Sequence, residues 1–132
     1  MSESRDGRSD PAEWLRFAEE DLGLATRVSK DSSVSPRAAC WHAQQAAEKA
    51  LKAALLEQGS TFPRTHNLLA LRALLNAERA EQLRPEDLAE LTAWAVEARY
   101  PGDWDEPDRE AAVAAARMAA DIVAAATDWI GV

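Results

Sequence analysis

Alanine accounts for 29 of the 132 residues, whereas the chain has only five glycines and six prolines. Alanine has the highest intrinsic helix propensity of all residues. Apolar residues recur at three- and four-residue spacing along most of the chain, and no segment alternates apolar and polar residues as a half-buried strand does. The sequence therefore predicts an all-α fold, an antiparallel bundle of about five helices.

Two long helices follow from start and stop signals in the first half of the chain. Asp10 can cap a helix over residues 11–30, whose first residue is a proline and so suits the first helical position. A second Ser-Pro start signal predicts a helix over residues 36–58. Gly59 stands just past its end, where a residue with a left-handed backbone commonly closes a helix.

Two shorter helices are predicted in the middle of the chain. Thr65 is expected to cap a helix that carries leucines up to Leu75 and has His66 in its first turn. The free N–H groups and the dipole at such a helix start favour an anion. An Arg-Pro-Glu-Asp start signal predicts a fourth helix over residues 85–96.

The last helix is expected to start at Asp105 or Glu106 with Pro107 and to reach about Ile130. Its inner side is almost entirely alanine, valine, methionine and isoleucine. The segment 99–105 before it contains proline and glycine, which interrupt a helix. Three tryptophans are expected to pack in the core of the bundle: Trp41, Trp94 and Trp104.

The length fits one domain, over residues 11–132, behind a polar tail of residues 1–10 that we expect to be disordered. No apolar run is long enough to span a membrane, and the N-terminus has no apolar signal region. The single cysteine cannot form an internal disulfide, and one cysteine with two histidines has no zinc spacing. We expect a cytoplasmic protein that uses no metal and no cofactor.

Charge is distributed unevenly along the chain. The net charge is −8, which excludes a wholly basic surface for nucleic acid. Residues 37–72 nevertheless carry five basic and two acidic side chains, and both histidines lie there as well. This locally basic centre can receive an anion such as a phosphate. The alternative is that the excess arises by chance along one helix.

Four polar side chains form one row on the helix predicted over residues 36–58, namely His42, Gln45, Lys49 and Lys52. Surface rows of this kind are usually solvated. Cys40 and His42 are two residues apart and diverge on a helix, so they are not a nucleophile–base pair, and Cys40 is expected to be buried and structural. The signatures of common enzyme classes are absent.

Three motifs occur in a fixed order: Gln-Ala-Ala-Glu-Lys at residues 45–49, Thr-His-Asn-Leu at 65–68 and Arg-Tyr-Pro at 99–101. Together they resemble the HEPN domain, a small helical bundle found alone or beside a minimal nucleotidyltransferase in bacteria and archaea. The resemblance extends over residues 12–130, which is nearly the whole chain. Each motif alone is weak, but the three in this order are fairly specific.

The resemblance implies homodimers with a shared cleft between the protomers. Many HEPN proteins are toxins that cut RNA without a metal, through an Arg-x(4–6)-His motif at the start of the last long helix. Others lack this motif and bind nucleotides, or pair with an adjacent nucleotidyltransferase that acts as antitoxin. Arg99 matches the arginine of the motif, but no histidine follows it. Arg37 and His42 have the required spacing, but they lie at the start of the second helix.

Two sets of candidate residues result. For catalysis, Arg99 offers a cation for the developing phosphorane charge, and His66 or His42 offers proton transfer. The candidates for binding a nucleotide or phosphate are Arg99, Tyr100, Lys49, Lys52, His66, Gln45 and Glu48. The structural alternatives are an ion pair of Arg99 with Glu48 or Glu97, a core position for Tyr100, a capping role for His66, and buried hydrogen bonds of Gln45 and Glu48.

Three hypotheses about function follow. The first is a dimeric module that binds a nucleotide or nucleic acid, or docks a minimal nucleotidyltransferase in a toxin–antitoxin pair. The second is a metal-independent ribonuclease toxin that uses Arg99 with a histidine from elsewhere in the chain. The third is a purely structural dimerisation bundle. The missing histidine after Arg99 favours the first hypothesis, and alanine-rich faces with five tryptophans favour a homodimer.

Overall fold

The computed structural model describes residues 10–95 and 106–131, and these ranges contain helices and no strand. The all-α prediction is therefore confirmed, and six helices are consistent with a bundle of about five. In chain order the helices are α1 (Pro11–Ser29), α2 (Pro36–Glu57), α3 (Leu68–Arg72), α4 (Ala77–Ala80), α5 (Pro85–Ala93) and α6 (Arg109–Ile130). Within the described ranges, no helix is both long and apolar enough to cross a membrane.

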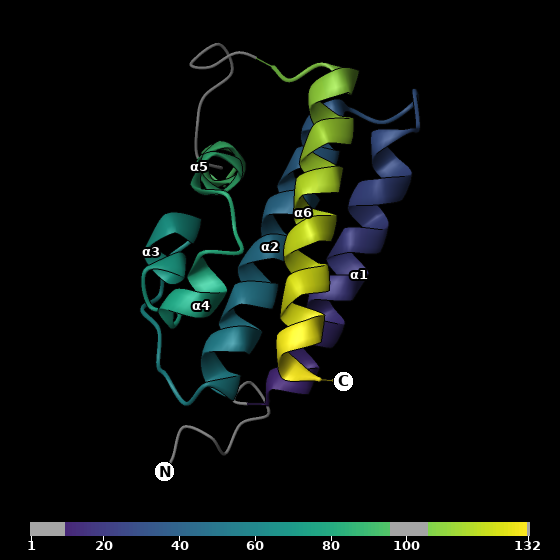
Figure 1. Ribbon diagram of the computed structural model, residues 1–132. Coiled ribbons are helices and arrows are strands. Elements are labelled where there is room, and N and C mark those ends of the chain that lie inside the picture. Colours follow the sequence, from purple (N-terminus) through teal and green to yellow (C-terminus); the bar gives the residue numbers. More distant parts are fainter. Residues whose placement is uncertain (1–9, 96–105, 132) are drawn as a thin grey trace.

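The three long helices α1, α2 and α6 pack side by side, and the short helices α3, α4 and α5 lie together on one side of α2 (Figure 1). α1 runs antiparallel to both of its neighbours. α2 and α6 run in the same direction, because the segment with the three short helices returns the chain to the end where α2 begins. α2 is thus the central helix of the molecule.

Small residues explain how neighbouring helices approach α2 so closely. Seven of its alanines are fully buried. Because each carries only a methyl group, the neighbouring helices can pack close to the α2 backbone at those positions. Leucines from the surrounding elements fill the remaining space and make the core continuous. Among the described residues, the largest fully buried side chains are leucines, namely Leu15 of α1, Leu51 and Leu55 of α2, Leu68 and Leu71 of α3, and Leu88 and Leu91 of α5.

The ends of α1 and α2 agree with the predicted signals. The Asp10 side chain accepts a hydrogen bond from the Ala12 N–H at 3.0 Å, and the Ser35 hydroxyl accepts one from the Arg37 N–H at 3.2 Å. Gly59 follows α2 with a φ of +88°, the left-handed conformation that glycine adopts without a steric penalty.

The third helix starts later than predicted. Asn67, not Thr65, is its N-cap, and its side chain accepts hydrogen bonds from the N–H groups of Leu69 and Ala70. Thr65 instead accepts a hydrogen bond from the Asn67 N–H at 3.0 Å. Asparagine is a better cap than threonine, and two cap-type residues stand in succession here. His66 therefore precedes α3, and its predicted place in the first turn is wrong.

Three other boundaries differ from the prediction. α3 ends at Arg72, and a separate one-turn helix, α4, follows behind the cap Asn76. α5 ends at Ala93 rather than at residue 96. α6 begins at Arg109, because the Asp108 side chain caps it and accepts a hydrogen bond from the Ala111 N–H. Pro107 thus lies outside the helix that it was expected to open.

Arg109 joins the first turn of α6 to the α1–α2 connection. Its guanidinium donates hydrogen bonds to the backbone oxygens of Val28 at 3.0 Å, Ser29 at 3.3 Å and Val34 at 2.7 Å. Carbonyl groups at the end of a helix have no partner within the helix. A single charged side chain therefore provides hydrogen-bond donors for the backbone oxygens at the end of α1. The same contacts hold the first turn of α6 against the α1–α2 connection.

Candidate functional site

Glu48 is at the centre of a buried cluster on α2. Its side chain is only 7% exposed. One carboxylate oxygen, Oε1, lies 2.8 Å from His66 Nδ1 and accepts a hydrogen bond from Gln44 Nε2 at 3.2 Å. The other oxygen, Oε2, accepts a hydrogen bond from Lys52 Nζ at 2.8 Å. Both oxygens are thus engaged, and Glu48 joins α2 to the segment that precedes α3.

The surroundings of Glu48 favour its ionised form. Burial on its own raises the pKa of the carboxyl group, since a charge is poorly solvated inside a protein. The hydrogen bonds from Lys52, His66 and Gln44, together with the charge of Lys52, outweigh that effect. The pKa of Glu48 therefore lies below its ordinary value.

Lys52 is buried as deeply as its partner, with a side chain that is 9% exposed. Its ammonium group lies 5.3 Å from the centre of the Phe62 ring and 5.9 Å from that of Trp14. The two rings meet edge to face, with centres 6.0 Å apart. Lys52 is held between a carboxylate and two aromatic rings, which stabilise a cation that has lost most of its water.

His66 is the accessible member of this cluster, with 54% of its side chain exposed. Its position is fixed from two sides. Its Nδ1 faces the buried carboxylate of Glu48, and its backbone oxygen accepts a hydrogen bond from Gln44 Nε2 at 3.1 Å. An exposed imidazole ring is therefore held by a buried carboxylate, an arrangement that orients a histidine for proton transfer or hydrogen bonding.

A second cluster, which also combines a carboxylate with a histidine and a lysine, surrounds Asp21 of α1. Asp21 Oδ1 lies 3.0 Å from His42 Nδ1, and Oδ2 accepts a hydrogen bond from Lys49 Nζ at 2.6 Å. The side chains of His42 and Lys49 are 29% and 30% exposed, and that of Asp21 is 12% exposed. This cluster joins α1 to α2, and it differs from the first in having a less accessible histidine.

The polar row predicted on α2 is real, but it is not a solvated row. Lys52 is buried, and His42, Gln45 and Lys49 are half-buried. Gln45 donates a hydrogen bond to Gln44 Oε1 at 2.8 Å. His42 and Lys49 contact Asp21 of α1, whereas Lys52 pairs with Glu48 within α2.

Asp21 and Gln44 were not among the predicted site residues, although the sequence contains a signal for each. Asp21 falls on the apolar stripe of α1, between Ala18 and Ala25, and a carboxylate at such a position needs a buried partner. Gln44 likewise falls on the stripe of Cys40, Ala47 and Leu51 on α2 and, like them, is fully buried. A polar residue on a core-facing stripe was the available indication in both cases.

The excess of basic residues over positions 37–72 is largely compensated in three dimensions. Lys49 and Lys52 pair with carboxylates, and Arg37 lies 2.9 Å from Glu106. Arg64 is exposed, two residues before His66. The two lysines that the sequence suggested for anion binding are thus paired with carboxylates, whereas Arg64 is exposed near His66 in the sequence.

Several predicted residues give a mixed outcome. Arg99, Tyr100 and Trp104 lie outside the described residues. Trp94 packs against the core, whereas Trp41 is half-buried on α2.

Cys40 is a buried free thiol, as predicted. Burial, and to a lesser extent the charges of nearby acidic residues, raises its pKa to about 11. Over residues 10–95 and 106–131, no group of three or more His, Cys, Asp or Glu side chains is arranged to hold a metal ion.

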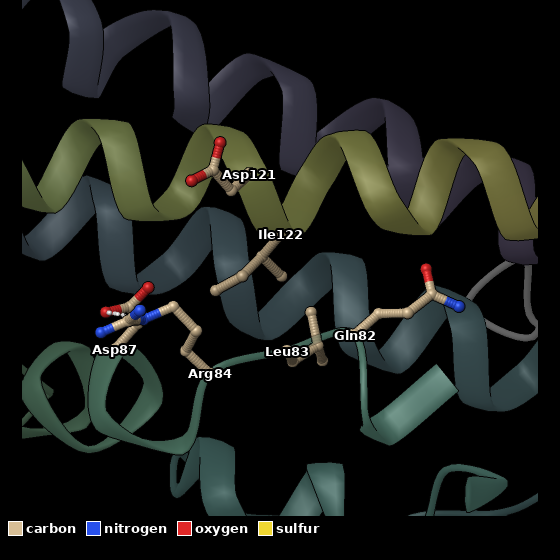
Figure 2. A pocket seen from close by; sticks show the side chains of 6 residues that line it. All are labelled: Gln82, Leu83, Arg84, Asp87, Asp121 and Ile122. Carbon is tan, nitrogen blue, oxygen red and sulfur yellow. Dashed lines mark ion pairs between the residues drawn. The ribbon is translucent and has the colours of Figure 1, made fainter. Parts of the chain in front are cut away.

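A shallow hollow of about 220 Å³ lies elsewhere, between α6 and the start of α5 (Figure 2). Ile122 of α6 points from one side toward Leu83 on the other, and Arg84 pairs with Asp87 at the rim at 3.6 Å. Asp121 adds a second carboxylate to its lining. The acidic side chains outnumber the single cation, so this hollow does not favour a phosphate.

Two solved structures resemble the chain over most of its length. TT1696 from Thermus thermophilus is 29% identical, with a TM-score of 0.73, over 90% of this chain and 97% of that chain. ST0689, an archaeal HEPN homologue, is 26% identical, with a TM-score of 0.53, over 92% of this chain and 93% of that chain. No curated protein sequence matches the chain. The HEPN domain family matches residues 11–129, and the chain therefore belongs to the HEPN domain family.

Proposed function

We propose that this HEPN protein is a dimeric module that binds a nucleotide or a nucleic-acid phosphate beside His66. The observation that carries the proposal is the half-exposed imidazole of His66, held 2.8 Å from the buried carboxylate of Glu48. A side chain fixed before the ligand arrives loses less conformational entropy on binding.

The neighbouring residues fit a nucleotide or phosphate ligand. Arg64 supplies an exposed cation two residues away, and the guanidinium is well suited to phosphate oxygens. The partly exposed Gln45 and Lys49 lie on the same helix as Glu48. Arg99 and Tyr100 belong to the proposal on the strength of the family motif, as a further cation and a ring that stacks on a base.

The binding proposal is tested with a fluorescently labelled, single-stranded RNA and the purified full chain. We expect His66→Gln and Arg64→Gln each to weaken binding about tenfold, which corresponds to about 1.4 kcal/mol. The control is Arg117→Gln, which removes an exposed arginine from α6 and should leave the affinity unchanged. No binding by the wild-type chain, or equal binding by His66→Gln, would overturn the proposal.

The same pair of residues favours one second candidate, a metal-independent ribonuclease. A histidine oriented by a carboxylate is a typical general base, and Arg99 would stabilise the developing charge on the phosphorane. The test is incubation of total RNA with the protein in the presence of a metal chelator. Cleavage that is lost in both His66→Gln and Arg99→Ala supports a ribonuclease, and intact RNA with the wild-type chain rejects it.

The quaternary part of the proposal is a homodimer that pairs with a minimal nucleotidyltransferase of the toxin–antitoxin type, in the cytoplasm. Within residues 10–95 and 106–131, the exposed large apolar side chains are Leu24, Leu69 and Leu74. Leu24 lies on α1 and Leu69 on α3, so these side chains do not form one patch, and the dimer rests on the family resemblance and the alanine-rich faces. Light scattering at micromolar concentration should give twice the mass of one chain, and a monomer would reject the dimer. Co-purification with the nucleotidyltransferase of its own genome tests the pairing.

A further inference from the structure

The hydrogen bonds around Glu48 determine which nitrogen of His66 carries a proton. An ionised carboxylate has no proton and can only accept hydrogen bonds. Glu48 is ionised because Lys52 pairs with one of its oxygens and because its pKa lies below the ordinary value. The contact of 2.8 Å between Glu48 Oε1 and His66 Nδ1 therefore requires an N–H group at Nδ1.

A neutral imidazole carries one proton, so a proton at Nδ1 leaves Nε2 with a lone pair. Nε2 has no hydrogen-bond partner among residues 10–95 and 106–131, and the ring is 54% exposed. In its neutral form, His66 therefore offers a ligand a hydrogen-bond acceptor and not a donor. A phosphate oxygen also accepts, so the two do not bind each other well.

We propose that His66 recognises a ribose hydroxyl of the ligand through Nε2, while Arg64 contacts the phosphate. This inference rests on the proposed function, because it assigns a specific contact within that same site. A ribose 2′-hydroxyl donates the proton that an unprotonated Nε2 needs. Deoxyribose has no such group, and a deoxyribonucleotide leaves Nε2 without a partner at this position. Glu48 is then a positioning residue that selects the sugar through the tautomer of His66.

The binding experiment compares RNA and DNA strands of matched sequence at about pH 8, where an ordinary histidine side chain is neutral. We expect wild-type protein to bind the RNA about fivefold more tightly, the effect of one hydrogen bond worth about 1 kcal/mol. His66→Phe should bind RNA and DNA equally. Arg64→Gln should weaken both and keep their ratio, because it removes only the phosphate contact.

The possible outcomes separate this inference from the proposed function. Equal affinity of the wild-type chain for RNA and DNA overturns the hydroxyl contact, while the binding module itself stands. A preference for RNA that survives in His66→Phe also overturns it. If neither strand binds, the proposed function fails and the inference fails with it.

A second measurement needs neither a ligand nor a substitution. The ¹⁵N chemical shifts of the two imidazole nitrogens of a histidine distinguish the nitrogen that carries the proton from the one that does not. We expect His66 in the wild-type chain to be protonated at Nδ1 and unprotonated at Nε2. A proton on Nε2 in the neutral ring overturns the inference directly. Glu48→Gln, whose amide can donate to Nδ1, should shift the proton toward Nε2.

Discussion

Lys52 Nζ and Glu48 Oε2 lie 2.8 Å apart on α2, and both side chains are less than one-tenth exposed. The comparable pair Lys49–Asp21 has a shorter contact of 2.6 Å, but its lysine is 30% exposed. A buried charge that loses its partner is strongly destabilising, whereas a partly exposed one is still solvated. Folding therefore removes more of the solvation of Lys52 than of Lys49, although both pair with a buried carboxylate.

We expect Lys52→Met to lower the free energy of unfolding by about 3 kcal/mol, because it leaves the buried Glu48 charge without its ammonium partner. The control is Arg16→Met, which removes the partner of the exposed carboxylates Glu13 and Glu20 and should lower it by less than about 1 kcal/mol. Chemical denaturation of the two variants measures the difference. Equal losses of unfolding free energy in the two variants would contradict a special role for the buried ion pair. The double variant Lys52→Met with Glu48→Gln should recover part of the loss.

The stability of the protein should fall in acid through Glu48. Its pKa is lower in the folded chain than its ordinary value of 4.5, so the unfolded chain takes up this proton first as the pH falls. The stabilisation is fully present above the unfolded pKa and is lost as the pH falls through the folded one. Thermal denaturation between about pH 6 and pH 3 should therefore show a steeper loss for the wild type than for Glu48→Gln. Parallel curves would refute the assignment.

Alanine substitution should have opposite effects at two glycines. Gly59→Ala forces an L-residue into a φ of +88° and should cost about 1 kcal/mol, although a Cβ there would meet no atom within 4 Å. Gly23→Ala lies within α1, where a Cβ would have an ordinary contact of 3.6 Å with Arg27, and should stabilise by about 0.5 kcal/mol. Melting temperatures of the two variants test the prediction, and changes of the same sign would contradict it.

The Cys40 thiol should be unreactive in the folded protein. Burial is the main reason for its raised pKa of about 11, and little thiolate is then present near neutral pH. A thiol reagent should label the native chain only through unfolding, and it should label one thiol per chain at once in guanidinium chloride. Rapid labelling of the native protein would show that Cys40 is accessible. Conditions that stabilise the fold should slow the labelling in proportion.

The sequence alone predicts those helix ends that are set by a capping residue next to them. The ends of α1 and α2 depend on Asp10, Ser35 and Gly59, which act locally and are recognisable from residue type alone. The start of α3 was missed because Thr65 and Asn67 both suit a cap. Only the geometry of the chain shows that one of them caps the helix and the other forms a turn before it.

The candidate site was predictable in its residue types but not in its contacts. Lys49 and Lys52 are three residues apart on α2 and look equivalent in the sequence. Their environments differ because Asp21 comes from α1, while Lys52 lies against an aromatic pair contributed by α1 and the segment after α2. Contacts between distant parts of a chain depend on how the helices cross, and the periodicity within one helix does not reveal that geometry.

The parallel course of α2 and α6 has a consequence for the order of folding. α1 and α2 are joined by a short connection and can close as a helical hairpin early, with little loss of chain entropy. α6 must instead return across residues 58–108 before it packs against both of them. We therefore expect the α1–α2 hairpin to dominate the folding nucleus, and α6, with its Arg109 contacts, to dock in a later, slower step.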